Sequence, residues 1–390
     1  MEVAVLPPPP VLKRKLVSVR EISSIGKIPR STQVVVYIDG WSVVVPKRRP
    51  THQAGDLVVY FEIDSFLPKS DSRFWELFLE PGATEVFRGN HGYRVKSKRH
   101  GAHLSQGLIF PLDDFPEIRD HVRVAGTDVA TAQLLGKSFA GLLGVEKWEF
   151  TESAASLPSL GRPPSFIYLP GWERIQNMER SIFSIAGRKK VWQISEKLDG
   201  VTMMVYKLAK DSGWASCLPA LPAGYPPSMQ DEKNRYGICS RREDLIDRDG
   251  NLYWDVAKKS GVLGKLCNFG LANFAVQGEL CGSSIEGNTM NYPEGKHEFI
   301  VFGMWNIDTG RYMPPKEFAG LCSKLGIKHT PILGHSSMDR FARNVSELLS
   351  KAEDGTSEFG GVREGFVFKS LDGTKQFKVI SNKWLSLTGK

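Results

Sequence analysis

A lysine stands between acidic residues at Glu196, Lys197 and Asp199, in the stretch SEKLDGVTMMVY (195–206). A lysine amine attacks an electrophile only when it is uncharged, and its burial and its charged neighbours control that state. Apolar residues alternate with polar ones on both sides, as in strands, and the Asp-Gly pair predicts a hairpin turn between them. Solvated charges on a surface hairpin are the ordinary explanation for such a stretch.

Two later strand-like stretches carry residues that could serve the same site. In VQGELCG (276–282), Glu279 lies between apolar residues. A buried carboxylate needs a partner there, such as a ribose hydroxyl or a metal-bound water. In HEFIVFGMW (297–305), Phe302 lies within an apolar run, where a core aromatic is the structural alternative.

A third stretch, REGFVFKSLDGTKQFKVIS (363–381), predicts a hairpin that turns at another Asp-Gly pair. It carries Glu364, Lys369 and Lys378 at strand positions. An edge carboxylate and exposed strand lysines are common, so each residue alone has a structural explanation. The joint occurrence of all these residues in one order favours a shared active site.

The ordered motifs EKxDG, SRR, QGEL, FIVFG, EGFVFK and FKVIS resemble those of the covalent nucleotidyltransferase superfamily, which contains RNA ligases, DNA ligases and mRNA capping enzymes. The EK pair before LDG is more similar to RNA ligases than to DNA ligases. With GWSVVVP, AGDLVVYFEIDSFLP and SQGLIFPL on its N-terminal side, the chain resembles the Rnl5-type ATP-dependent RNA ligases, exemplified by Deinococcus and Naegleria proteins. The resemblance covers roughly residues 12–390, with 211–235 as an insertion.

The resemblance implies a role for each motif residue. Lys197 would attack the α-phosphate of ATP and carry AMP, and Glu196 would lie near the nucleotide. Asp199, Glu279 and Glu364 would hold Mg²⁺ or Mn²⁺. A cation that keeps most of its waters needs only a few carboxylate partners, which this set could supply.

The other motif residues would surround the nucleotide, according to the same resemblance. Glu279 would also contact the ribose, and Arg241 or the arginine after it would bind ribose or phosphate. Phe302 would stack on the adenine, and Lys369 and Lys378 would contact the α-phosphate. Some relatives have a second lysine two positions after the last one, where this chain has an isoleucine.

Hydrophobic periodicity predicts the elements that position these residues. In 12–115, about five short strands, including the hairpin QVVVYIDGWSVVVP (33–46), predict a small β barrel, with an OB-fold as the leading candidate. Residues 116–172 form a connecting segment, with a helix predicted over 122–147 and a linker rich in Ser, Pro and Gly over 150–172.

Residues 173–390 mix strands and helices and predict an α+β domain with antiparallel sheets. The resemblance identifies it as an adenylyltransferase domain with an ATP-grasp-like, nucleotidyltransferase fold. Helices are expected within 172–187, 253–269, 315–326 and 338–353. Strands are expected at 191–198, 201–208, 273–281, 298–305, 365–370 and 375–381, and the proline-rich 211–235 predicts a surface insertion.

A basic stretch in the barrel, YRVKSKRH (93–100), predicts contact with nucleic acid. It carries Arg94, Lys96, Lys98 and Arg99 beside an aromatic residue, a pattern that can follow a phosphate backbone. Solvated loop charges are the alternative.

The composition limits the class of protein. The 390 residues are 41% hydrophobic and 24% charged, enough for two domains with cores. The net charge of +8 fits a polyanion partner and a mildly basic enzyme about equally. Five cysteines without a CxxC pair favour a reducing compartment. Because no apolar run approaches the ~20 residues of a membrane span and the N-terminus lacks a signal peptide's long apolar region, we expect an intracellular protein, cytoplasmic or nuclear.

The resemblance implies an ATP-dependent RNA ligase, which we expect to act as a monomer. Its expected substrate is RNA with 3′-hydroxyl and 5′-phosphate ends, at nicks in RNA duplexes or RNA–DNA hybrids. One alternative is another covalent nucleotidyltransferase, either a capping-type guanylyltransferase or a DNA ligase. The other alternative is a non-catalytic OB-fold protein that binds RNA.

Overall fold

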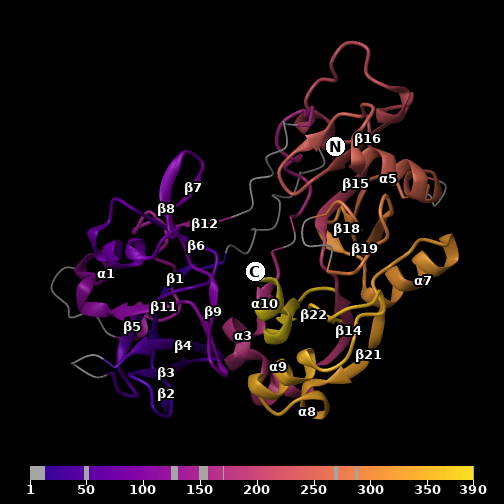
Figure 1. The fold of residues 1–390 in the computed structure, drawn as a ribbon. Coiled ribbons are helices and arrows are strands. Elements are labelled where there is room, and N and C mark those ends of the chain that lie inside the picture. The colour runs from indigo at the N-terminus through magenta and orange to yellow at the C-terminus, as the bar shows by residue number, and fades with distance from the viewer. Residues whose placement is uncertain are drawn as a thin grey trace. The chain divides into compact units, whose positions relative to one another are not determined.

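The computed structural model describes residues 14–47, 52–123, 131–148, 157–169, 171–267, 271–285 and 289–389, and Figure 1 shows the course of the chain. Its contacts divide the chain into two compact units. The first unit spans Lys13–Glu152 and includes Ile175–Glu179 and Leu385–Lys390. The second unit contains Ser153–Arg174 and Arg180–Trp384.

The first unit is built mainly of short antiparallel strands. They are β1 (Val17–Glu21), β2 (Ser24–Lys27), β3 (Gln33–Ile38), β4 (Trp41–Pro46), β5 (Leu57–Phe61), β6 (Ser65–Pro68), β7 (Glu85–Phe87), β8 (Asn90–Arg94), β9 (Ser97–His100), β10 (His103–Gln106), β11 (Leu108–Pro111) and β12 (Glu146–Lys147). The sheets have the orders β1-β5-β11, β2-β3-β4 and β12-β6-β8-β7, and β9 pairs with β10. The helical turns are η1 (Ser72–Leu79), η2 (Leu112–Asp114), α1 (Pro116–Val122) and α2 (Thr131–Leu134).

The predicted hairpin at 33–46 is confirmed, because β3 and β4 pair from Gln33 with Pro46 to Ile38 with Trp41. Asp39 in its turn has a φ of 49°, a left-handed conformation that aspartate tolerates. The last predicted strand of the barrel is divided at Gly107, whose φ is 113°. The chain therefore makes two strands there, β10 and β11.

The helix predicted over 122–147 is wrong in the part that the structure describes. Apart from Val122 at the end of α1, only Thr131–Leu134 is helical, and the chain then turns at Gly136 and Gly144, which have φ values of 77° and 62°. These left-handed glycines end any regular helix. The apolar residues that suggested a helical period instead complete the core of the first unit: Leu134, Phe139, Leu143 and Val145.

The second unit contains two sheets. One has the order β13-β23-β22-β14-β21, in which β13 pairs in parallel with β23 and the other pairs are antiparallel. The other is antiparallel, with the order β17-β16-β15-β18-β19-β20. The strands are β13 (Glu173–Arg174), β14 (Val191–Lys197), β15 (Val201–Ala209), β16 (Asn234–Cys239), β17 (Asp244–Leu245), β18 (Phe274–Gly282), β19 (His297–Asn306), β20 (Arg311–Tyr312), β21 (Ile332–Ser337), β22 (Gly365–Ser370) and β23 (Gln376–Ile380).

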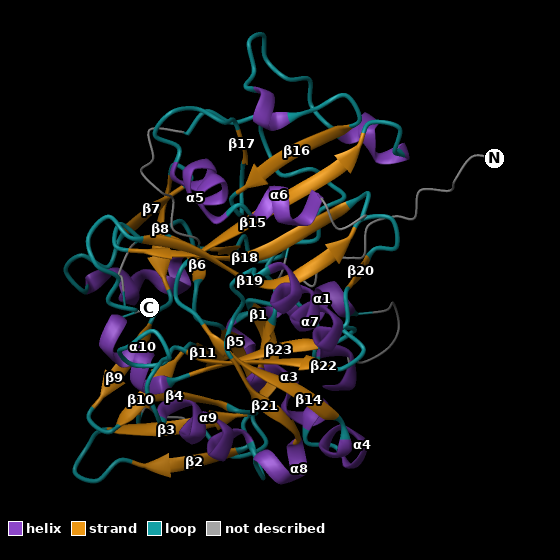
Figure 2. Ribbon diagram, turned by 90° about the vertical axis from the view of Figure 1, so that its right-hand side faces the viewer, coloured by secondary structure: helices purple, strands orange, loops and turns teal. Residues whose placement is uncertain are grey.

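All four helical regions predicted between 172 and 353 contain helices. The helices are α3 (Ile175–Ile182), α4 (Ile185–Lys189), α5 (Leu252–Ser260), α6 (Val262–Cys267), α7 (Pro315–Leu325), α8 (Met338–Phe341), α9 (Val345–Glu353) and α10 (Asn382–Thr388), with the short turns η3 (Gly213–Cys217) and η4 (Pro227–Met229). Parts of α3 and α10 belong to the first unit. Figure 2 shows α5 and α6 beside the strands of the six-stranded sheet, and their apolar side chains share one core with β15, β18, β19 and α7. Within the described residues, no helix is both long enough and apolar enough for a membrane span.

The hairpin predicted at Asp199 and Gly200 is wrong. Strand β14 pairs with β21 and β22, whereas β15 pairs with β16 and β18, so the two strands belong to different sheets. The Asp-Gly pair is the crossing point between the sheets. A Cβ on Gly200 would lie 2.7 Å from the carbonyl oxygen of Leu280, so this crossing needs a residue without a side chain.

The described part of the predicted linker, 157–169, is part of the second unit and packs into its core. Phe166 and Ile167 are buried in an apolar cluster that includes Tyr206. The backbone N–H of Leu160 donates to the carbonyl oxygen of Asp244 at 2.7 Å. The proline-rich 211–235 connects the paired strands β15 and β16.

Candidate active site

Lys197 is the last residue of β14, and its Nζ lies 2.8 Å from Oε1 of Glu364. The two side chains are 18% and 8% exposed, so the ion pair is largely buried. Glu364 directly precedes β22, whose first residue, Gly365, is paired with Lys197. A Cβ on Gly365 would lie 2.0 Å from the carbonyl oxygen of Val379, so close strand contact requires glycine beside this ion pair.

Charges around Lys197 favour its protonated form. Burial by itself lowers the pKa of Lys197, but the carboxylates of Glu364, Glu279 and Asp199 together outweigh it and raise the pKa above the ordinary value. Burial also raises the pKa of Glu279 to about 7, although Lys197 and Arg241 favour its charged form. The structure thus brings together Lys197, Asp199, Glu279 and Glu364, which come from three separate stretches of the sequence.

The donor set suits a hydrated divalent cation. Within the described residues, no three His, Cys, Asp or Glu side chains form a ready-made metal cage. Mg²⁺ usually keeps several waters and uses one or two carboxylates, so Asp199, Glu279 and Glu364 can serve it without such a cage. Thr289 Oγ1 donates to Asp199 Oδ2 at 2.8 Å and orients that carboxylate. The sequence contained no signal for Thr289.

Phe302, Lys369 and Trp172 form a second cluster, in which two rings enclose a buried lysine. The rings of Trp172 and Phe302 are 4.9 Å apart and meet edge to face. Lys369 Nζ donates to the backbone oxygen of Phe302 and lies 5.5 Å from the Trp172 ring. Burial lowers the pKa of Lys369 to about 7. Sequence reasoning missed Trp172 because it ends a stretch with a linker composition.

Glu196 and Lys197 are neighbours on one strand, so their side chains leave on opposite faces. Glu196 is 2% exposed, and it accepts a hydrogen bond from the backbone N–H of Glu358 at 3.2 Å. Burial raises its pKa. Arg241 lies close enough to Glu279 to lower the pKa of that carboxyl, which favours Arg241 over the next arginine as the residue in the site.

Lys378 lies on β23, directly beside Arg174 in the parallel register of β13. Side chains of paired residues share a face of the sheet, so two cations point the same way. Arg174 is 6% exposed. The sequence did not predict that Arg174 lies beside Lys378, because a strand of two residues has no periodicity.

The four cations predicted to contact nucleic acid lie on β8, β9 and their connection in the first unit. All of them have partners. Arg94 bonds Asp64 at 3.0 Å and stacks on Trp148, Lys96 pairs with Glu85 at 2.5 Å, Lys98 pairs with Glu80 at 2.7 Å, and Arg99 donates to Ser386 at 2.9 Å. Lys96 and Lys98 are each 43% exposed, so a phosphate could replace an acid as their partner.

Known protein families match both units of the chain. The RNA ligase family model matches residues 190–385, and the PHA02142 OB-fold domain model matches residues 16–112. The predicted OB-fold is thereby confirmed. No curated protein sequence matches the chain.

Three solved structures of Naegleria gruberi RNA ligase are similar to nearly the whole chain. They contain the enzyme with PPi, a glutamate-to-alanine variant with ATP and Mn, and a second glutamate-to-alanine variant with AMP and Mn. Each is 30% identical, and the match covers 96% of this chain and 99% of that one. The TM-scores are 0.77, 0.77 and 0.78.

Proposed function

The chain belongs to the RNA ligase family, as an ATP-dependent ligase of the Rnl5 type, and we propose that it joins RNA ends through AMP held on Lys197. One observation carries the proposal: Lys197 lies at the crossing between two sheets, where Glu364 comes from one sheet and Glu279 from the other. A solvated surface lysine would not be surrounded by three carboxylates, of which Glu364 is buried and Asp199 and Glu279 are partly buried.

The first step is a phosphoryl transfer that needs an uncharged Lys197. Its ammonium proton lies on the hydrogen bond to Glu364, so that carboxylate is placed to receive it. The Nζ–phosphorus bond then forms as the bond between the α-phosphorus and the bridging oxygen breaks. Pyrophosphate leaves with the electron pair of the broken bond. Lys369 and Lys378 stabilise the charge that develops on the α-phosphate oxygens.

Asp199, Glu279 and Glu364 would hold Mg²⁺ or Mn²⁺, mostly through water. The cation would supply positive charge at the phosphates and offset the carboxylate charge that raises the pKa of Lys197. Phe302 and Trp172 would face the adenine, and Arg241 the ribose or a phosphate. Glu196 would support the nucleotide from the other face of β14.

Two further steps would complete the reaction. AMP passes from Lys197 to a 5′-phosphate end of RNA, which forms a pyrophosphate linkage and restores the lysine. A 3′-hydroxyl attacks the 5′-phosphorus, its proton leaves, and AMP departs as the phosphodiester forms. Every residue proposed for this chemistry comes from one chain, so we propose that a monomer suffices.

The Naegleria structures support these assignments. The two substituted glutamates and a substituted lysine in them have the same spacing along the chain as Glu279, Glu364 and Lys378. Other variants replace a lysine and an aspartate separated by one residue, as Lys197 and Asp199 are. Their ligands include ATP, AMP and PPi, which are the substrate and products of the proposed chemistry.

We propose nicked RNA duplexes or RNA–DNA hybrids as substrates, with Arg94, Lys96, Lys98 and Arg99 contacting the backbone. A duplex holds both ends in place, which lowers the entropic cost of bringing them together. The cations would exchange their acidic partners for phosphates on binding. Sealing assays on matched nicks, with RNA or DNA on each side, would define the strand requirement.

The decisive test is covalent labelling with radioactive ATP or GTP. Wild type should gain AMP from ATP, whereas Lys197→Ala should gain none. Lys197→Arg is the matched control, because it keeps the charge opposite Glu364 but a guanidinium does not deprotonate to a nucleophile. Labelling from GTP alone would favour a capping-type enzyme, and labelling of either variant would exclude Lys197 as the nucleophile.

A further inference from the structure

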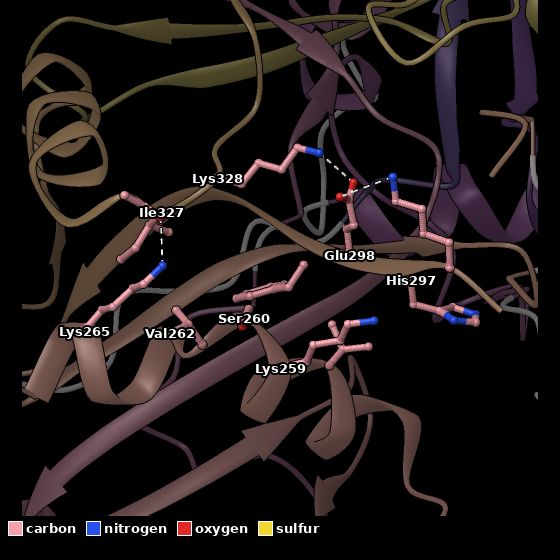
Figure 3. A pocket seen from close by; sticks show the side chains of 12 residues that line it. Lys259, Ser260, Val262, Lys265, His297, Glu298, Ile327 and Lys328 are labelled. Carbon is pink, nitrogen blue, oxygen red and sulfur yellow. Dashed lines mark hydrogen bonds and ion pairs between the residues drawn. The ribbon is translucent and has the colours of Figure 1, made fainter. Parts of the chain in front are cut away.

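A cavity of about 300 Å³ opens among α5, α6, the start of β19 and the segment after α7. That volume lies at the lower end of the range for ligand pockets. Its floor is apolar, formed by Val256, Val262, Phe299 and Ile327. Figure 3 shows that Lys259, Lys265 and Lys328 lie around the cavity rather than on one side of it.

The lining of the cavity is strongly cationic. Lys259, Lys265, Lys296 and Lys328 all line it, and Glu298 is its one acidic residue. Lys328 pairs with Glu298 at 2.6 Å and Lys296 lies 3.9 Å from the same carboxylate. Lys265 donates to the backbone oxygen of Gly326 at 2.8 Å. Among the described residues that line the cavity, four lysines face one carboxylate, and this positive excess favours an anion.

The cavity lies on the face of the sheet opposite the candidate active site. Glu279 is paired with Ile300, and the next pair, Leu280 with Phe299, points to the other face. Phe299 lines the cavity and belongs to the core covered by α5, α6 and α7. The two sites nevertheless share one end of the sheet. Gly282 lies three residues after Glu279 on β18, and it pairs with His297, which lines the cavity.

We propose that this cavity binds a backbone phosphate of the RNA substrate, a few nucleotides away from the join. The inference rests on the proposed function. Ammonium groups act as point charges toward phosphate and place no demand on base sequence. Along β18, Glu279 and Gly282 are three residues or about 10 Å apart, and the two sites lie on opposite faces at this end of the sheet. RNA that continues past the join beyond this end of the sheet can therefore contact the cavity as well as the active site.

The salt dependence of RNA binding tests this proposal. The affinity of the full-length protein for a nicked RNA duplex should be measured across a series of salt concentrations. Each lost phosphate contact lowers the slope of log affinity against log salt by about one. We expect that loss of about one for the double variant Lys259→Ala with Lys296→Ala, and a smaller loss in the same direction for Lys259→Ala alone. Two duplexes of unrelated sequence should be weakened equally.

Three controls make the outcome specific. Lys316→Ala removes an exposed lysine from α7 outside the cavity and should leave the slope unchanged. Lys259→Arg keeps the charge and should restore the slope. Labelling by ATP without RNA should be equal in wild type and Lys259→Ala. If wild type is not labelled, the proposed function fails, while the binding comparison still tests the cavity.

Two results would overturn the proposal. One is a slope for the double variant that equals that of wild type. The other is a result in which Lys259→Ala leaves the RNA slope unchanged but removes the thermal stabilisation that inorganic phosphate gives to wild type. That result would assign the cavity to a free anion.

Discussion

Replacing Lys369 with methionine should stabilise the ligand-free protein and abolish its labelling by ATP. Lys369 is 7% exposed, and burial lowers its pKa from 10.5 to about 7. An unfolded chain holds the proton up to the ordinary pKa, so the folded state binds fewer protons between these values. The free energy of unfolding therefore rises with pH through this window. Methionine is similar in length and removes the ionisable group.

The size of the effect follows from those two pKa values. One pKa unit corresponds to 1.36 kcal/mol, so Lys369 should make wild type about 2 kcal/mol more stable at pH 8.5 than at pH 6.5. Glu279, with a pKa raised by burial to about 7, acts in the opposite direction. Its contribution is present in both proteins and cancels in the difference between wild type and Lys369→Met.

Urea unfolding at pH 6.5, 7.5 and 8.5 measures that difference. We expect Lys369→Met to be more stable at pH 6.5 and its advantage to shrink by about 2 kcal/mol at pH 8.5. Lys316→Met on the surface of α7 is the control and should show no such trend. A pH-independent difference would refute the reasoning, because Lys369 would then keep its ordinary pKa in the folded protein.

Three other substitutions test separate parts of the second unit. Trp172→Ala should raise KM for ATP in the labelling reaction about two- to tenfold, the usual size of an aromatic pair, while Trp172→Phe should keep most of the affinity. Gly200→Ala should destabilise the protein by about 1–3 kcal/mol in urea, since its Cβ would meet the oxygen of Leu280 at 2.7 Å. Asp244 has a pKa raised by burial from 3.8 to about 6, so wild type should lose about 2 kcal/mol of stability between pH 4 and 7. Asp244→Asn should remove that loss. If the free energy of unfolding depended on pH in the same way in wild type and in Asp244→Asn, this prediction would be wrong.

Local pattern was sufficient to predict most strands and helices of the second unit. The strands around Glu279 and Phe302 have alternating or continuous apolar residues, and the hairpin before Lys378 has an Asp-Gly turn, so their periods identify them. The pattern failed over 122–147, where spaced apolar residues fit a helical period but serve a core reached through left-handed glycines. Hydrophobic periodicity indicates which residues are buried, but it does not indicate which other segments of the chain pack over them.

The sequence by itself determined the chemical groups and their order: a lysine, three carboxylates, an aromatic residue and two further lysines in motifs that resemble one family. Only the tertiary structure decided what those groups do to one another. The crossing at Asp199 and Gly200 joins two sheets instead of forming a hairpin, and it brings Glu279 of the second sheet to the site. The pairing of β14 with β22 places Glu364 within 2.8 Å of Lys197. The pairing of β13 with β23 places Arg174 beside Lys378. Strand pairing over long separations is a property of the whole core, whereas a residue's chemistry is local and is visible in the sequence.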